Sequence, residues 1–81
     1  IEEVLDEIED EIERLSQKMR LLISKGEIIT FSNLVKGLER IEMIKAFIVL
    51  LFMAQKGKVT LWQSEELGEI YIILNEENRG D

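Results

Sequence analysis

The sequence predicts a small α+β domain, and three observations carry this prediction. Apolar residues recur at heptad spacing through residues 1–24, which is typical of a long amphipathic helix. Residues 41–54 form a second, almost wholly apolar run with two charged side chains. Alternating polar and apolar residues at 58–63 and an apolar run at 69–74 are typical of two short strands. A chain of 81 residues has room for one such domain, 1–81.

The first helix is expected over residues 1–24 and should end before Gly26, because glycine commonly terminates helices. Two interpretations of its apolar seam are open. The seam either packs on the core of this domain, or it makes a coiled-coil contact with another part of a longer protein. Its members are spaced alternately four and three residues apart: Ile1, Leu5, Ile8, Ile12, Leu15, Met19 and Leu22.

Charge is unevenly distributed along the chain. Residues 1–14 hold eight acidic side chains and one arginine, which equals the net charge of −7 of the whole chain. We interpret this acidic run as a solvated helix face. Residues 36–58 carry five cations against two carboxylates. Because affinity for nucleic acid grows with each phosphate neutralised, so thin a basic stretch predicts little direct contact with DNA.

The other expected elements complete the order of a winged helix. They are a brief strand at 27–30, a second helix over 33–36 capped by Ser32, a third helix over 39–56, a turn at 64–68 between the two strands, and a polar tail, 75–81, that should fray. The order is therefore helix, strand, helix, helix, strand, wing, strand, with a long first helix and a body at 27–74.

Catalysis and metal binding lack their usual residues. The chain contains no cysteine and no histidine, so thiolate nucleophiles, imidazole bases and the usual zinc ligands are absent. The acidic cluster of Glu65, Glu66 and Glu69 is interpreted as a solvated turn. We predict a non-enzymatic domain with no cofactor and no metal.

The apolar run at 41–54 is too short to span a membrane, which takes about 20 residues, and Lys45 interrupts it. We therefore expect no membrane association, and a cysteine-free chain is compatible with the cytoplasm.

The third helix has two candidate faces. Spacing places Val49 and Phe52 with Lys45 and Lys56 on one face. The other face is predicted to be core and contains Ile44, Phe47, Ile48, Leu51 and Ala54. On that assignment Val49 and Phe52 occupy positions at which a DNA-binding recognition helix carries polar side chains, so the helix is predicted to bind protein. The open alternative is that these two residues are also buried. Trp62 is either a wing-surface residue or a lid over the end of the first helix.

Several runs together resemble the carboxy-terminal winged helix of the kleisins, and more narrowly that of the prokaryotic segregation and condensation protein A family. They are Arg40-Ile41-Glu42, Phe47-Ile48-Val49-Leu50-Leu51, Lys56-Gly57-Lys58-Val59, Gln63-Ser64-Glu65 and Leu67-Gly68-Glu69-Ile70. The resemblance covers about residues 31–74. The chain departs from the family pattern at four positions, where the family usually has threonine, glutamate, phenylalanine and aspartate: Ala46, Phe52, Leu67 and Glu69.

The resemblance implies a domain that docks on the ATPase head of a structural maintenance of chromosomes (SMC) protein and closes the condensin ring in chromosome segregation. The family's head contact matches Phe47, Leu51 and Gln63, although helical spacing predicts the first two as core. We expect the energetic centre of the contact among Phe47, Leu51, Phe52, Trp62 and Gln63, with strand addition at the wing edge. The chain begins at Ile1 and is expected to be a fragment. Its missing parts would bind other condensin subunits, and the whole would be cytoplasmic and nucleoid-associated.

Two other functions are open from the residues alone. One is a DNA-binding winged-helix transcriptional regulator that dimerises through the first helix. The other is a plain assembly module whose heptad seam is the working part.

Overall fold

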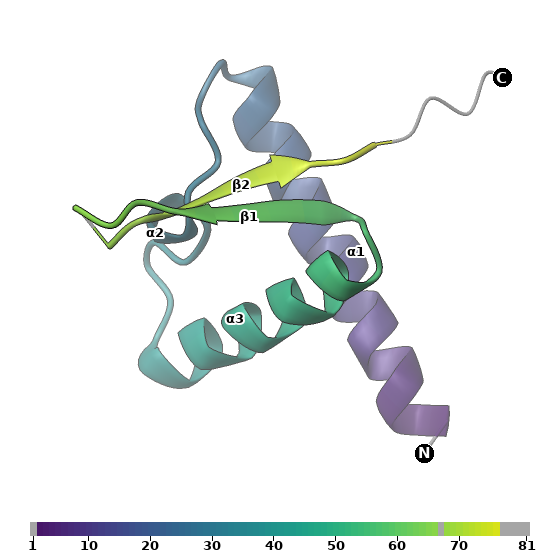
Figure 1. Cartoon of the computed structure of the whole chain (residues 1–81). Helices are drawn as coiled ribbons and strands as arrows, with labels where there is room; N and C mark the ends of the chain where they lie inside the picture. Colours follow the sequence, from purple (N-terminus) through teal and green to yellow (C-terminus); the bar gives the residue numbers. More distant parts are fainter. Residues whose placement is uncertain (1, 67, 77–81) are drawn as a thin grey trace, which may run out of the picture.

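The computed structural model describes residues 2–66 and 68–76, with side chains from Asp6 onward. The elements are α1 (Glu2–Ser24), α2 (Phe31–Leu34), α3 (Arg40–Gln55), β1 (Val59–Gln63) and β2 (Ile70–Leu74). The hairpin of β1 and β2 lies across the domain between α3 and the upper part of α1 (Figure 1). The predicted α+β winged helix with a long first helix is confirmed, and the bounds of α3 and both strands agree with prediction to within one residue.

The seam of α1 packs on the core of this domain. Ile12 and Met19 are buried, and Ile8, Leu15 and Leu22 are half-buried against the same cluster. Ile1 and Leu5 fall outside the residues whose side chains are described. From Ile8 onward, the first of the two interpretations of the seam is therefore the correct one.

The segment before α2 differs from prediction. The strand expected at 27–30 is reduced to a single bridge, Thr30 with Tyr71, supported by a hydrogen bond from the Ile72 N–H to the Ile29 carbonyl at 3.0 Å. The strand is cut short because α2 begins at once, at Phe31. The cap of α2 is Thr30 and not Ser32, since the Thr30 side chain accepts the Asn33 N–H at 3.1 Å.

The two faces of the hairpin differ. Cross-strand partners run from Val59 with Leu74 to Gln63 with Ile70. Because side chains alternate along a strand, the inner face carries Val59, Leu61, Gln63, Ile70, Ile72 and Leu74, and the outer face carries Thr60, Trp62, Tyr71 and Ile73. Val59 and Ile72 are buried, which shows that the inner face covers the core.

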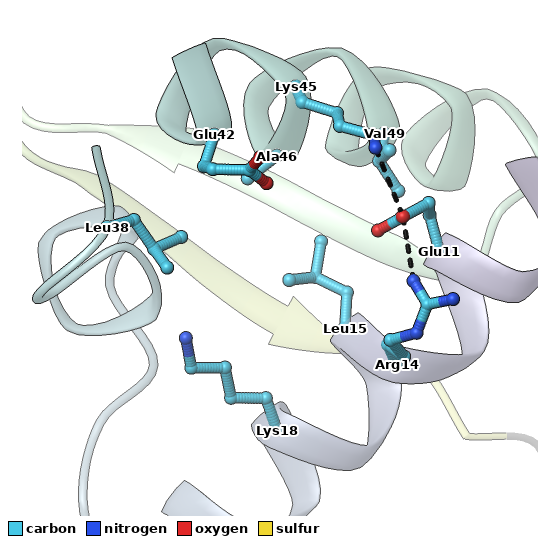
Figure 2. A pocket seen from close by; sticks show the side chains of 9 residues that line it. All are labelled: Glu11, Arg14, Leu15, Lys18, Leu38, Glu42, Lys45, Ala46 and Val49. Atoms are coloured by element: carbon cyan, nitrogen blue, oxygen red, sulfur yellow. Dashed lines mark hydrogen bonds and ion pairs between the residues drawn. The ribbon is translucent and has the colours of Figure 1, made fainter. Parts of the chain in front are cut away.

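Glu11 joins α1 to α3. Its carboxylate accepts from Arg14 at 2.7 Å and lies 3.3 Å from the ammonium of Lys45 (Figure 2). Partial burial raises the pKa of Glu11, but the hydrogen bonds from Arg14 and Lys45 outweigh it, so the pKa lies below its usual value.

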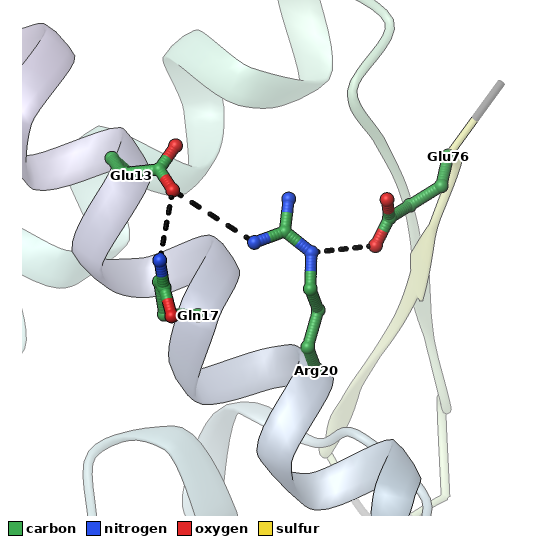
Figure 3. A network of polar contacts seen from close by, with 4 residues as sticks. All are labelled: Glu13, Gln17, Arg20 and Glu76. Atoms are coloured by element: carbon green, nitrogen blue, oxygen red, sulfur yellow. Dashed lines mark hydrogen bonds and ion pairs between the residues drawn. The ribbon is translucent and has the colours of Figure 1, made fainter. Parts of the chain in front are cut away.

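The start of the tail is attached to the domain. The Asn75 N–H donates to the Lys58 carbonyl at 2.8 Å, and its side-chain amide donates to Thr60 Oγ1 at 2.8 Å. Arg20 of α1 donates to Glu76 at 2.8 Å and lies 3.8 Å from Glu13 (Figure 3). The predicted fraying is therefore wrong for residues 75 and 76, and residues 77–81 lie outside the described residues.

Within the described residues, no helix is both long enough and apolar enough to cross a membrane.

Candidate partner-binding surface

The buried face of α3 is not the predicted one. Ala46, Val49, Leu50 and Met53 are buried, whereas Ile44, Phe47, Ile48 and Leu51 of the predicted core are 38–50% exposed. The error has a simple cause, because both sets follow the spacing i, i+3, i+4, i+7 and differ only by a shift of two residues. The prediction that Val49 is exposed is likewise wrong, since it belongs to the core.

The exposed side of α3 carries six large apolar side chains, which we call the α3 outer face. They are Ile41, Ile44, Phe47, Ile48, Leu51 and Phe52. Sequence reasoning missed Ile41, Ile44 and Ile48 as site residues. The signal that could have found them is the composition of the helix, because a helix that is apolar all round leaves an apolar face exposed whichever side is buried.

Three of the predicted site residues lie on the α3 outer face. Phe47 lies at the edge toward α2, where its ring meets that of Phe31 edge-on at 5.9 Å. Phe52 lies at the opposite edge and lines, with Ile8, a small hollow beside α1. Leu51 lies between these two edges and is 47% exposed. The conflict between helical spacing and family resemblance is therefore resolved in favour of the resemblance, which required Phe47 and Leu51 to be accessible.

The other two predicted site residues lie on opposite faces of the hairpin. Gln63 is exposed at the end of the inner face, the face against which α3 packs. Trp62 is 63% exposed on the outer face and packs against Tyr71, with ring centroids 5.3 Å apart. Trp62 is thus a wing-surface residue and not a lid over α1.

β1 is the free edge of the sheet. Hydrogen bonds between Lys58 and Asn75 and between Ser64 and Glu69 fix the ladder, so the intervening Thr60 and Trp62 turn their backbone groups toward β2. The N–H and C=O groups of Leu61 and Gln63 therefore point away from β2. No other described segment pairs with this edge, since the bridge at Thr30 lies on the far side of β2.

Glu69 fixes the base of the wing to α2. Its carboxylate accepts the Ser32 hydroxyl at 2.7 Å and the backbone N–H groups of Ser32 and Ile70 at 3.3 and 3.1 Å. The hydrogen bond from the Ser32 hydroxyl is the main reason that the pKa of Glu69 lies below its ordinary value of 4.5. The acidic cluster predicted at 65, 66 and 69 is therefore not uniformly solvated, because Glu69 has a structural role.

This contact predicts a pH dependence of stability. Because the pKa of Glu69 is lower in the folded state, its stabilising effect is present above about pH 4.5 and is lost as the pH falls through the lowered value. Replacing Glu69 by Gln keeps an acceptor for Ser32 but removes the charge. We expect E69Q to flatten the loss of stability below pH 4.5 in urea unfolding. E65Q, which removes the same charge from the same turn, should retain the wild-type slope, and an equal slope in E69Q would contradict the assignment.

Fold and surface together define a class of protein: a winged-helix domain whose third helix presents apolar side chains in place of the polar groups that read DNA. No family model matches the chain. Over 71 residues the chain is 34% identical to Segregation and condensation protein A of two Desulfitobacterium hafniense strains, DSM 10664 / DCB-2 and Y51. These matches cover 88% of the chain and 27% of each relative, so the chain spans about a quarter of the length of these curated relatives.

One solved structure is similar to this chain over nearly the whole length of the solved domain. It is the C-winged helix domain of ScpA, in a crystal structure of the SmcHead bound to that domain. The match has a TM-score of 0.70 at 30% identity and covers 84% of this chain and 99% of that one. The chain belongs to the segregation and condensation protein A family, in which it corresponds to the C-winged helix domain.

Proposed function

We propose that this domain docks on the ATPase head of an SMC protein, and that it thereby closes a condensin ring in chromosome segregation. The observation that carries the proposal is the α3 outer face, because its six large apolar side chains are 38–67% exposed. The solved relative, which is bound to an SMC head, supports it. Other condensin subunits would bind parts of the protein outside this chain. The protein would be cytoplasmic and associated with the nucleoid.

The proposed role is binding and not catalysis. Full burial of a large apolar side chain is worth about 1.5–3 kcal/mol before association costs, so the α3 outer face would supply apolar burial that favours binding. Phe47, Leu51 and Phe52 are the proposed anchors, since the two phenylalanines are the largest side chains of this face and Leu51 lies between them.

Strand addition at β1 would bring Trp62 and Gln63 into the same contact. A partner strand paired with the free edge would place its side chains alternately on the two faces of the hairpin. One set would then lie beside Trp62, and the other beside Gln63 and α3. All five predicted site residues are compatible with one partner on this arrangement, although Trp62 and Gln63 face opposite ways.

Proline at position 63 tests strand addition. Because the Gln63 N–H points away from β2, Q63P removes a donor from the free edge without removing a hydrogen bond of the hairpin. We expect Q63P to bind the head at least about 10-fold more weakly than Q63A, a loss of about 1.4 kcal/mol or more. Q63A is the control for the lost side chain, and titration calorimetry is the measurement. Equal affinities for Q63P and Q63A would exclude pairing at this residue.

A DNA-binding regulator that dimerises through α1 is not favoured. Ile12 and Met19 of the α1 seam are buried in the domain's own core and are not available to a second copy. On α3, the ammonium of Lys45 is already paired with Glu11 at 3.3 Å. The burial of Ile12 and Met19 also counts against an assembly module that associates through the α1 seam.

The deciding experiment is a calorimetric titration of the domain with the SMC head of the same organism, with duplex DNA as a parallel titrant. Saturable one-to-one binding to the head with little for DNA is the expected result. Salt-dependent binding to DNA without binding to the head would overturn the proposal.

A further inference from the structure

A hollow of about 380 Å³ lies between α1 and α3 (Figure 2). Its floor is apolar and includes Leu15 of α1 and Ala46 of α3, while charged side chains stand around its rim. An apolar cavity of about 150 Å³ already admits benzene. The hollow therefore has room for one large apolar side chain together with polar atoms of its neighbour.

The α1 wall of the hollow carries two cations against the carboxylate of Glu11, and Glu42 adds a second carboxylate on the α3 side. Arg14 and Lys18 stand four residues apart on this wall, on either side of Leu15 (Figure 2). Glu11 is shared between Arg14 and Lys45. The Lys18 ammonium donates to the Leu34 carbonyl at 2.6 Å and has no carboxylate within ion-pair distance among the described residues. A carboxylate brought to this wall would meet one partly buried cation that lacks an anionic partner.

The hollow adjoins the α3 outer face at the ion pair of Glu11 and Lys45. Across the pair of Glu11 and Lys45 lies a second, smaller hollow of about 160 Å³. That smaller hollow is lined in part by Ile48 and Phe52, which belong to the α3 outer face. A partner that covers this face and extends past the pair of Glu11 and Lys45 would therefore meet Lys18.

We infer that the α1–α3 hollow receives an anchor from the SMC head: a large apolar side chain next to an acidic residue. The apolar side chain enters over Leu15 and Ala46, and the carboxylate pairs with Lys18. This inference rests on the proposed docking and adds the chemistry by which the head is recognised. It places a second anchoring point on α1, away from Phe47 and Gln63.

Two variants test the two halves of the inference. A46M fills the hollow from its floor with a residue that favours helix. We expect it to weaken head binding at least 10-fold in titration calorimetry. K18M keeps an unbranched side chain one atom shorter and removes the charge, and it should weaken binding at least threefold and reduce the salt dependence of the affinity. K18R should restore most of the binding. K36M is the matched control, because Lys36 is exposed, lies outside the hollow and loses the same charge in the same substitution.

The outcomes separate this inference from the proposed function. If the wild-type domain does not bind the head, the proposed docking fails and the inference fails with it. If the wild type binds and both A46M and K18M bind within twofold of it, the docking stands and the inference is overturned. Circular dichroism and thermal unfolding establish that each variant is folded, and K18M decides alone if A46M does not fold. A loss in K36M equal to that in K18M would also overturn the inference.

Discussion

Replacing Leu51 by Glu is expected to abolish binding to the SMC head while the domain stays folded. Leu51 lies in the middle of the α3 outer face and is 47% exposed, so a carboxylate there remains solvated in the free domain. In the complex the same carboxylate would be buried without a partner, and the burial of the exposed half of the leucine, roughly half of the 1.5–3 kcal/mol for full burial, would be lost. We expect at least a 100-fold loss of affinity, about 2.7 kcal/mol or more.

The control for this variant is L21E. Leu21 is 55% exposed near the end of α1 and is not part of the α3 outer face. L21E should bind the head within about twofold of the wild-type affinity. It should change the unfolding midpoint no more than L51E does. Titration calorimetry and thermal unfolding of the two variants side by side are the measurements. An L51E variant that is folded and binds as tightly as the wild type would remove the α3 outer face from the contact.

Substitution of the neighbouring Leu50 should reduce the stability of the domain, whereas substitution of Leu51 should reduce its affinity for the head. Leu50 is fully buried at the centre of the core, and replacing such a leucine by alanine typically costs about 2–5 kcal/mol. A core in a domain of this size rarely supplies more than about 3–5 kcal/mol. L50A is therefore expected to be largely unfolded at 25 °C, or to unfold at a far lower urea concentration than the wild type.

L51A is the matched comparison for L50A, because it deletes the same atoms one position along the helix. We expect it to lose less than about 1 kcal/mol of unfolding free energy, since the side chain is half exposed. Its effect should instead be on head affinity. Urea unfolding of L50A and L51A is the measurement, and equal destabilisation by the two substitutions would show that the assigned orientation of α3 is wrong.

Much of the fold was predictable because local signals were strong. The heptad seam of α1, the apolar run of α3 and the alternation in β1 each depend on residues close together in the chain, and their bounds were predicted closely. The segment between Gly26 and Gly37 was predicted less well. There Thr30, and not Ser32, caps α2. Ser32 bonds instead to Glu69, which is 37 residues away in the sequence, and this distant partner is not visible in a local pattern.

The candidate site was predictable in composition but not in orientation. The residues of the chain alone show that α3 is apolar on nearly every side and that no cysteine or histidine chemistry is available. Which side of α3 faces solvent depends on packing, because the sets beginning at Ile44 and Ala46 have the same helical spacing and differ only in how α1 and the sheet pack against them. The same holds for the hairpin: alternation separated Trp62 from Gln63, but the bridge of Thr30 to Tyr71 decided that β1 is the strand with a free edge.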